Sequence, residues 1–189
     1  MSAPDRNARM IRAFVALPLP ESVRSQLAVT QFLLPLPRPV PPANMHVTLA
    51  FLGDLSEPVL EEVDAALARL RAPPLHLSVA GLGVFGGEAP RNVHALLTAN
   101  PALEHLQARV AQAVRNAGVA LQGKRFVPHV TLGRLAPGQV SAAELAKAMG
   151  EIGAVTSPPF TVSEFALYRS LLRRNGPVYD MLADYPLDG

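Results

Sequence analysis

Two identical tetrapeptides carry the residues of this sequence that are best suited to acid–base chemistry. His46–Leu49 and His129–Leu132 both have the sequence HVTL, so each begins with an imidazole and places a hydroxyl two residues later. Because the unperturbed pKa of histidine lies near neutrality, a pair of histidines can supply one acid and one base. Threonine hydroxyls can donate hydrogen bonds to phosphate oxygens. The repeated motif therefore predicts a site that transfers protons at a phosphodiester.

Strand geometry would bring these groups to one surface. Each tetrapeptide begins an apolar stretch, and side chains on a strand alternate between its two faces. His46 and Thr48 would then share one face, and His129 and Thr131 would do the same in the second copy. We expect two such strands to present two imidazoles and two hydroxyls to one cleft.

A structural role is the alternative for any single His-x-Thr sequence, because threonine is common on strands. The duplication favours catalysis, since packing would explain repeated Val and Leu but not a repeated His on the open face. His76 and His105 are expected to be exposed, and neither has a partner at metal-ligand spacing. The chain has no cysteine, which excludes thiolate ligands. We predict no metal site and no cofactor.

Composition restricts the class of protein. The 189 residues are 49% hydrophobic and 17% charged, which is typical of a globular domain. A net charge of +2 argues against broad nucleic-acid binding but allows a nucleotide or an RNA end. No apolar run is long enough to span a membrane, and residues 1–10 do not resemble a signal peptide. We therefore expect a cytoplasmic monomer without membrane contact.

Periodicity and turn residues predict an α+β fold with a mainly antiparallel sheet. Strands are expected at 11–17, 46–53, 75–79, 93–98, 130–135, 160–167 and 178–182. Helices are expected at 21–34, after Ser56, between Asn100-Pro101 and Gly118, and after a capping box at Ser141–Glu144. The glycines after residue 80, including Gly81 and Gly83, are interpreted as loop residues.

The two motifs in this layout resemble the two-histidine (2H) phosphoesterase superfamily, in particular its LigT-like RNA 2',3'-cyclic phosphodiesterase branch, also called 2'-5' RNA ligase-like. Residues 42–53 and 125–134 are similar to its two signature motifs, and the similarity covers nearly the whole chain. The opening strand at 12–18 and the segments at 167–170 and 185–187 are also similar to family segments.

The resemblance implies one bilobal domain over residues 1–189, with two pseudo-symmetric lobes of mainly antiparallel sheet. Helices would pack outside, and the active site would lie in the groove between the lobes. It also implies metal-independent hydrolysis of a 2',3'-cyclic phosphate, on an RNA end or a nucleotide, to a 2'-phosphomonoester. Reversible 2'-5' RNA ligation would be a second activity.

The same resemblance implies a role for each site residue. His46 would donate a proton to the departing 3' oxygen, and His129 would be the base that activates water. Thr48 and Thr131 would hold the phosphate. Arg134 would meet the phosphate charge, although strand alternation places it opposite His129 unless the strand bends after Gly133.

Some assignments stay open at this stage. The family often has an aromatic residue where this chain has His94, which we interpret as a packing or rim residue. Phe14 and Phe51 are expected in the core, with base stacking as the alternative. Other surface arginines, namely Arg38, Arg125, Arg169, Arg173 and Arg174, together with Lys124, are expected to be exposed, where some could form a basic rim that guides RNA.

Two other functions are compatible with the sequence. One is a non-catalytic module that binds RNA ends or nucleotides with the same fold. The other is a phosphodiesterase for another cyclic phosphate, such as an ADP-ribose derivative. The intact pair of His and pair of Thr favours an enzyme over the binding module.

Overall fold

The computed structural model describes residues 10–123, 125–174 and 176–189. Lys124 lies outside this part of the chain. The described helices are α1 (Glu21–Phe32), the short 3-10 helix η1 (Pro42–Asn44), α2 (Glu57–Leu67), α3 (Pro101–Asn116) and α4 (Ala142–Ile152). The described strands are β1 (Ile11–Pro18), β2 (Arg38–Pro39), β3 (His46–Leu55), β4 (Leu75–Leu77), β5 (Val79–Phe85), β6 (Asn92–Leu97), β7 (His129–Arg134), β8 (Phe160–Val162), β9 (Glu164–Arg173) and β10 (Gly176–Pro186).

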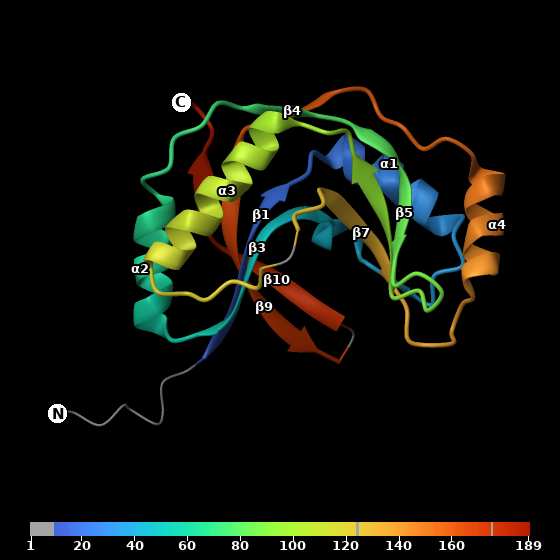
Figure 1. Ribbon diagram of the computed structural model, residues 1–189, viewed down its shortest axis with the longest axis horizontal. Coiled ribbons are helices and arrows are strands. Elements are labelled where there is room, and N and C mark those ends of the chain that lie inside the picture. The colour runs from blue at the N-terminus through green and yellow to red at the C-terminus, as the bar shows by residue number, and fades with distance from the viewer. Residues whose placement is uncertain (1–9, 124, 175) are drawn as a thin grey trace.

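A single antiparallel sheet forms the centre of the molecule. Its strand order is β10-β9-β1-β3-β7-β6-β5, with β2 added beside β7, while β4 and β8 form a separate pair. Figure 1 shows α2 and α3 on one side of the molecule and α1 and α4 on the other, with the strands between them. This arrangement confirms the predicted α+β class and its antiparallel sheet.

The two halves of the chain exchange elements around the centre of this sheet. The elements β1, α1 and β3 of the first half have counterparts in β6, α3 and β7 of the second. However, β5 from the first half pairs with β6, and β9 from the second half pairs with β1. Likewise α3 packs against β3, and α1 packs against β7. Each side of the sheet is therefore built from both halves of the sequence.

Local sequence explains where the helices begin and end. The Asn100 side chain accepts a hydrogen bond of 2.9 Å from the amide of Leu103 at the start of α3. Gly118, with a φ of +86°, follows α3 in the left-handed region that favours glycine. The predicted capping box of α4 is present between Ser141 and Glu144. Ser56 occupies the N-cap position of α2, but its side chain makes no capping hydrogen bond.

The interpretation of Gly81 and Gly83 as loop residues was wrong, because both lie inside β5. The strand predicted at 75–79 is divided into β4 and β5, and that predicted at 160–167 into β8 and β9. Gly83 is directly opposite His94 of β6, and a Cβ on it would lie 2.5 Å from His94 Nε2. This glycine therefore provides room for a neighbouring side chain within a strand, a role that the sequence alone does not distinguish from a turn.

The apolar positions of the two motifs anchor the site to one continuous core. Val47, Leu49, Val130 and Leu132 are all buried, whereas the His and Thr positions between them are half-buried. The predicted alternation is thus confirmed in both copies. No helix in the described part of the chain is long and apolar enough to cross a membrane.

Candidate active site

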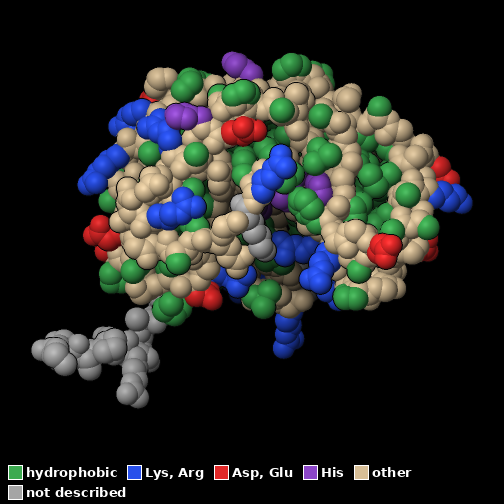
Figure 2. Space-filling view, in the orientation of Figure 1, with side chains coloured by type: hydrophobic (Ala, Val, Ile, Leu, Met, Phe, Trp, Pro, Cys, Tyr) green, Lys and Arg blue, Asp and Glu red, His purple; other side chains and the backbone are tan. Residues whose placement is uncertain are grey.

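The two motif strands meet at the centre of the sheet through one residue pair. Val47 of β3 and Val130 of β7 are direct antiparallel partners, and both are fully buried. Because they occupy the same position in each HVTL sequence, a local twofold axis passes between them. The flanking His and Thr of each motif then lie on the opposite face from the valines. Figure 2 shows a hollow in which histidine and cationic side chains gather.

A β-bulge interrupts the first motif strand directly after its threonine. Ala16 and Val15 are neighbours in β1, but their partners in β3 are Thr48 and Ala50. Leu49 is therefore an extra residue on β3, and the alternation of faces is reset at this point.

The second motif strand has the same interruption at the same leucine. His94 and Val93 are neighbours in β6, and their partners in β7 are Thr131 and Gly133. Leu132 is the extra residue here, and its carbonyl oxygen accepts hydrogen bonds from the Val40 amide at 2.8 Å and from the Gln31 side chain. The repeat therefore extends beyond the identical letters to a shared backbone irregularity.

These bulges change which residues lie on the face of the sheet that carries His46 and His129, here called the histidine face. Phe51 and Arg134 occupy equivalent positions, five residues after His46 and His129 respectively. Arg134 is the cross-strand partner of Asn92, two residues before His94, so it returns to the face that His94 and Thr131 share. The bend that Arg134 required is present, at Leu132 rather than after Gly133.

Both imidazoles are oriented by equivalent backbone hydrogen bonds. His46 Nδ1 lies 2.7 Å from the carbonyl oxygen of Asn44, and His129 Nδ1 lies 2.7 Å from that of Val127. Because a carbonyl oxygen only accepts, each Nδ1 carries a hydrogen, and Nε2 is the atom that exchanges protons. His46 Nε2 is also 3.1 Å from the hydroxyl of Thr48, which donates to it when the ring is neutral.

Aromatic rings enclose His46. Phe14 stacks on it with ring centroids 4.9 Å apart, and Tyr179 meets it edge-on at 5.4 Å. Tyr168 stacks on Phe14 at 5.2 Å and lies 6.5 Å from the His46 ring. This burial lowers the pKa of His46 to about 4, and the positive charges of Arg134 and His129 act in the same direction. The ligand-free site therefore holds His46 in its neutral form at pH 7.

His129 lies in a different environment. Its ring meets Phe85 and His94 edge-on, each at 5.0 Å between centroids, and these two rings stack on each other at 4.1 Å. Burial lowers the pKa of His129, although its hydrogen bond to the Val127 carbonyl opposes the shift. His129 is therefore a neutral imidazole at pH 7, as a general base requires.

His94 is the third histidine of this region, and only 2% of its surface is exposed. The sequence predicted either a packing or a rim position for His94. Packing is confirmed by this burial, and the rim position was wrong. Its Nδ1 donates to the side-chain oxygen of Asn92 at 3.0 Å. Burial, together with the charge of His129, lowers the pKa of His94 to about 4. His94 thus supports His129 as a neutral ring.

Two arginines stand opposite each other at the edge of the site. Arg38 of β2 is the cross-strand partner of Arg134, and both side chains are exposed. Like charges in directly opposed positions repel each other, so an anion that both could contact would relieve this repulsion. The effect of Arg134 on the pKa of His46 places its charge within electrostatic reach of that imidazole.

Sequence reasoning assigned no role to Tyr168 and Tyr179 and misplaced Phe51. Phe14 is buried as expected, at 4% exposed, and its ring stacks on His46. Phe51 is 67% exposed, so its expected core position was wrong. The bulge at Leu49 explains this difference, because it turns Phe51 to the histidine face. The presence of Tyr168 and Tyr179 in the two C-terminal strands was the only signal in the sequence that could have indicated their role.

The surface arginines separate into two groups. Arg169 is half-buried and pairs with Asp180 at 2.8 Å, so the expectation that it is exposed was wrong. The expected exposure is confirmed for the other described members of the set, namely Arg38, Arg125, Arg173 and Arg174. His76 and His105 are exposed, as expected. Within the described ranges, no three His, Asp or Glu side chains form a group that could hold a metal ion.

This fold and site define a class of protein with two histidines on paired strands of a duplicated α+β architecture. The sequence profile of the 2'-5' RNA ligase superfamily matches residues 19–174. The RNA 2',3'-cyclic phosphodiesterase of Thermus thermophilus is 36% identical over 191 aligned residues, covering 95% of this chain and 91% of that protein. The enzyme of the same name from Aeropyrum pernix is 33% identical and covers 74% of this chain and 80% of its own.

Solved structures agree with these relatives. TT0787 of Thermus thermophilus matches with a TM-score of 0.78 and 33% identity, covering 95% of this chain and 99% of that one. LigT of E. coli in complex with 3'-AMP matches with a TM-score of 0.77 and 27% identity, covering 94% and 98%. The chain belongs to the 2'-5' RNA ligase superfamily.

Proposed function

We propose that this protein is an RNA 2',3'-cyclic phosphodiesterase that opens the cyclic phosphate to a 2'-phosphomonoester by metal-independent acid–base catalysis. The observation that carries the proposal is the pairing of the two HVTL strands at Val47 and Val130. It places two imidazoles with equivalent backbone hydrogen bonds on one face of the sheet. Relatives that carry the name of this activity support the choice of substrate.

In the proposed reaction, water attacks phosphorus in line with the bond to the 3' oxygen. His129 Nε2 accepts the proton of this water as the new P–O bond forms. His46 Nε2 donates a proton to the 3' oxygen as the P–O3' bond breaks, so that the phosphate remains on the 2' oxygen. The two imidazoles end the cycle with exchanged protonation states, and solvent restores them.

Thr48 and Thr131 donate hydrogen bonds to the non-bridging oxygens, and Arg134 offsets their negative charge in the transition state. The support for Thr48 is its position on the histidine face, 3.1 Å from His46 Nε2. The support for Arg134 is the bulge at Leu132, which returns it to the same face.

The acid needs a proton that the ligand-free site does not favour. Because desolvation and the positive charge of Arg134 lower the pKa of His46, its charged form gains stability when an anion enters the site. A cyclic phosphate carries one negative charge, which opposes the effect of Arg134. Substrate binding therefore raises the pKa of His46 and promotes protonation of the acid.

The same chemistry allows ligation as a second activity. If the 5'-hydroxyl of another RNA takes the place of water, His129 accepts its proton and a 2'-5' phosphodiester forms. No separate set of residues is needed, because the departing 3' oxygen still receives its proton from His46. The name of the family supports this extension. Monomeric state and cytoplasmic location stay predictions.

Turnover of cytidine 2',3'-cyclic phosphate in excess EDTA tests the proposal. We expect cytidine 2'-monophosphate as the product, distinguished from the 3' isomer by ³¹P NMR or chromatography. A 3'-phosphate product, or activity only with added metal, would contradict the mechanism. Binding without turnover would favour the non-catalytic module, and turnover only of an ADP-ribose cyclic phosphate would favour the other alternative.

A further inference from the structure

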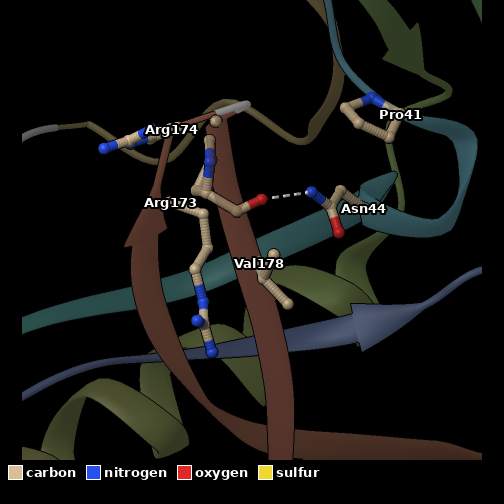
Figure 3. Close-up of a pocket in the computed structure, with 7 residues that line it drawn as sticks. Pro41, Asn44, Arg173, Arg174 and Val178 are labelled. Atoms are coloured by element: carbon tan, nitrogen blue, oxygen red, sulfur yellow. Dashed lines mark hydrogen bonds between the residues drawn. The ribbon is translucent and has the colours of Figure 1, made fainter.

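A cavity of about 510 Å³ lies beside the site, between the segment that precedes β3 and the end of the β9–β10 hairpin. Figure 3 shows its walls, with Pro41 and Asn44 on one side and Arg173, Arg174 and Val178 on the other. Arg173 runs along the hairpin past Val178, while the side chain of Arg174 points away from Asn44. The cavity therefore has apolar residues and two arginines in its lining.

Asn44 joins this cavity directly to the proposed acid. Its carbonyl oxygen accepts the hydrogen bond from His46 Nδ1 at 2.7 Å. Its side-chain nitrogen donates to the carbonyl oxygen of Pro177 at 2.8 Å, and so fixes the end of the hairpin (Figure 3). Tyr179, two residues further along β10, meets the His46 ring edge-on. Asn44 therefore contacts both the His46 ring and the cavity.

The charge of the cavity favours an anion. Arg173 and Arg174 are exposed, and no Asp or Glu is among the described residues that line the cavity. The nearby Arg169 differs, because Asp180 neutralises it. Pro41 and Val178 offer apolar surface that suits a sugar or the face of a base. Together these groups fit one nucleotide unit, with its phosphate at the arginines.

The direction of the proposed reaction decides which nucleotide this would be. Water attacks from the His129 side, so the departing 3' oxygen and the ribose that carries it lie on the His46 side. The RNA chain continues from the 5' oxygen of that ribose. In the arrangement that we infer, its path runs from the His46 side of the site toward the hairpin.

We propose that this cavity is a subsite for the penultimate nucleotide of an RNA substrate, in which Arg173 and Arg174 contact the phosphodiester on the 5' side of the terminal nucleoside. The inference rests on the proposed function and extends it, because it makes an RNA end a better substrate than a mononucleotide. A mononucleotide with a 2',3'-cyclic phosphate would occupy only the region between the two imidazoles.

The test compares two substrates with the same terminal nucleoside, cytidine 2',3'-cyclic phosphate and a short oligoribonucleotide that ends in it. The double variant Arg173→Ala/Arg174→Ala is measured beside Arg69→Ala/Arg115→Ala, which removes the same charge from two exposed arginines near the ends of α2 and α3. The readout is the ratio of kcat/KM for the oligonucleotide to kcat/KM for the mononucleotide. Thermal unfolding of each variant checks that the fold is retained.

We expect the wild-type ratio to exceed one and to fall roughly tenfold in the Arg173/Arg174 variant, because the charge-assisted hydrogen bonds to a phosphate are removed. The control variant should keep the wild-type ratio. The salt dependence of kcat/KM on the oligonucleotide should weaken by about 0.7 log units per decade for each phosphate that is no longer neutralised.

Three results would overturn the subsite. They are a wild-type ratio of one, an unchanged ratio in the Arg173/Arg174 variant, and an equal fall in the control. If kcat/KM falls by the same factor for both substrates in the Arg173/Arg174 variant, the ratio is unchanged, and this result also overturns the subsite. Failure of the wild-type protein to turn over either substrate would instead contradict the proposed function. The two failures are thus distinguishable.

Discussion

Val47 and Val130 are direct antiparallel partners at the point where the two motif strands meet. Both side chains point into the core, and the histidine and threonine on either side of each valine point into the cleft. One buried pair therefore sets the relation between the two imidazoles. Because the valines occupy equivalent positions in two copies of one tetrapeptide, His46 and His129 are related by local symmetry, and their surroundings make them differ.

The charge of Arg134 should be measurable at His46. Because this cation lowers the pKa of His46, Arg134→Ala should raise that pKa in the ligand-free protein. An NMR titration of the imidazole resonances measures the shift, and Arg115→Ala, which changes an exposed residue of α3, is the control. An unchanged or lowered pKa of His46 in Arg134→Ala would show that the guanidinium does not act on this ring.

Substrate should move the basic limb of the pH–rate profile. The basic limb of kcat/KM reports the pKa of the acid in the free enzyme, and the basic limb of kcat reports the pKa of the acid in the enzyme–substrate complex. Because the phosphate anion stabilises the charged form of His46, the basic limb of kcat should lie at higher pH than that of kcat/KM. Initial rates with cytidine 2',3'-cyclic phosphate between pH 3 and 9 measure both limbs. Coincident limbs, or a flat profile, would count against this coupling.

Acid should destabilise the fold through His94. Burial lowers its pKa from 6.5 to about 4, so between these values the unfolded chain binds a proton that the folded chain does not. The free energy of unfolding should therefore decrease as the pH falls through this range. Urea denaturation at pH 7 and pH 4.5 should show a smaller decrease for His94→Phe than for the wild type. Equal decreases would mean that His94 titrates normally.

Gly83 should tolerate no side chain. A Cβ at this position would lie 2.5 Å from His94 Nε2, so His94 must shift, and the ring of His129 lies against it. Gly83→Ala should cost about 1–3 kcal/mol of unfolding free energy, the range of other overpacked cores, and should also lower kcat. Gly150→Ala is the matched control, because nothing lies within 4 Å of its Cβ on the exposed side of α4. Equal stability of both variants would refute the packing argument.

Sequence alone could predict the histidine face but not all of its members. Alternation along two apolar strands was sufficient to place His46, Thr48, His129 and Thr131, because each strand is internally regular up to its threonine. The position of Arg134 depends on the bulge at Leu132. A bulge is defined by the register of the partner strand, which the local sequence does not contain.

The environments of the two histidines were also beyond the sequence. Phe14, Tyr168 and Tyr179 surround His46 although they come from distant parts of the chain, because β9 of the second half pairs with β1 of the first. Such an exchange between halves leaves no periodic signal. The glycine at position 83 was misinterpreted for a similar reason, since its constraint comes from a side chain on the neighbouring strand.

Replacement of each motif histidine tests the central claim most directly. His46→Ala and His129→Ala should each lower kcat/KM for cytidine 2',3'-cyclic phosphate by at least ~10²-fold, the lower end of the contribution of a general acid or base. His76→Ala, at an exposed histidine of β4, should retain the wild-type rate. Full activity in either motif variant, with the fold verified by thermal unfolding, would contradict the assignment of the two histidines as the acid and the base.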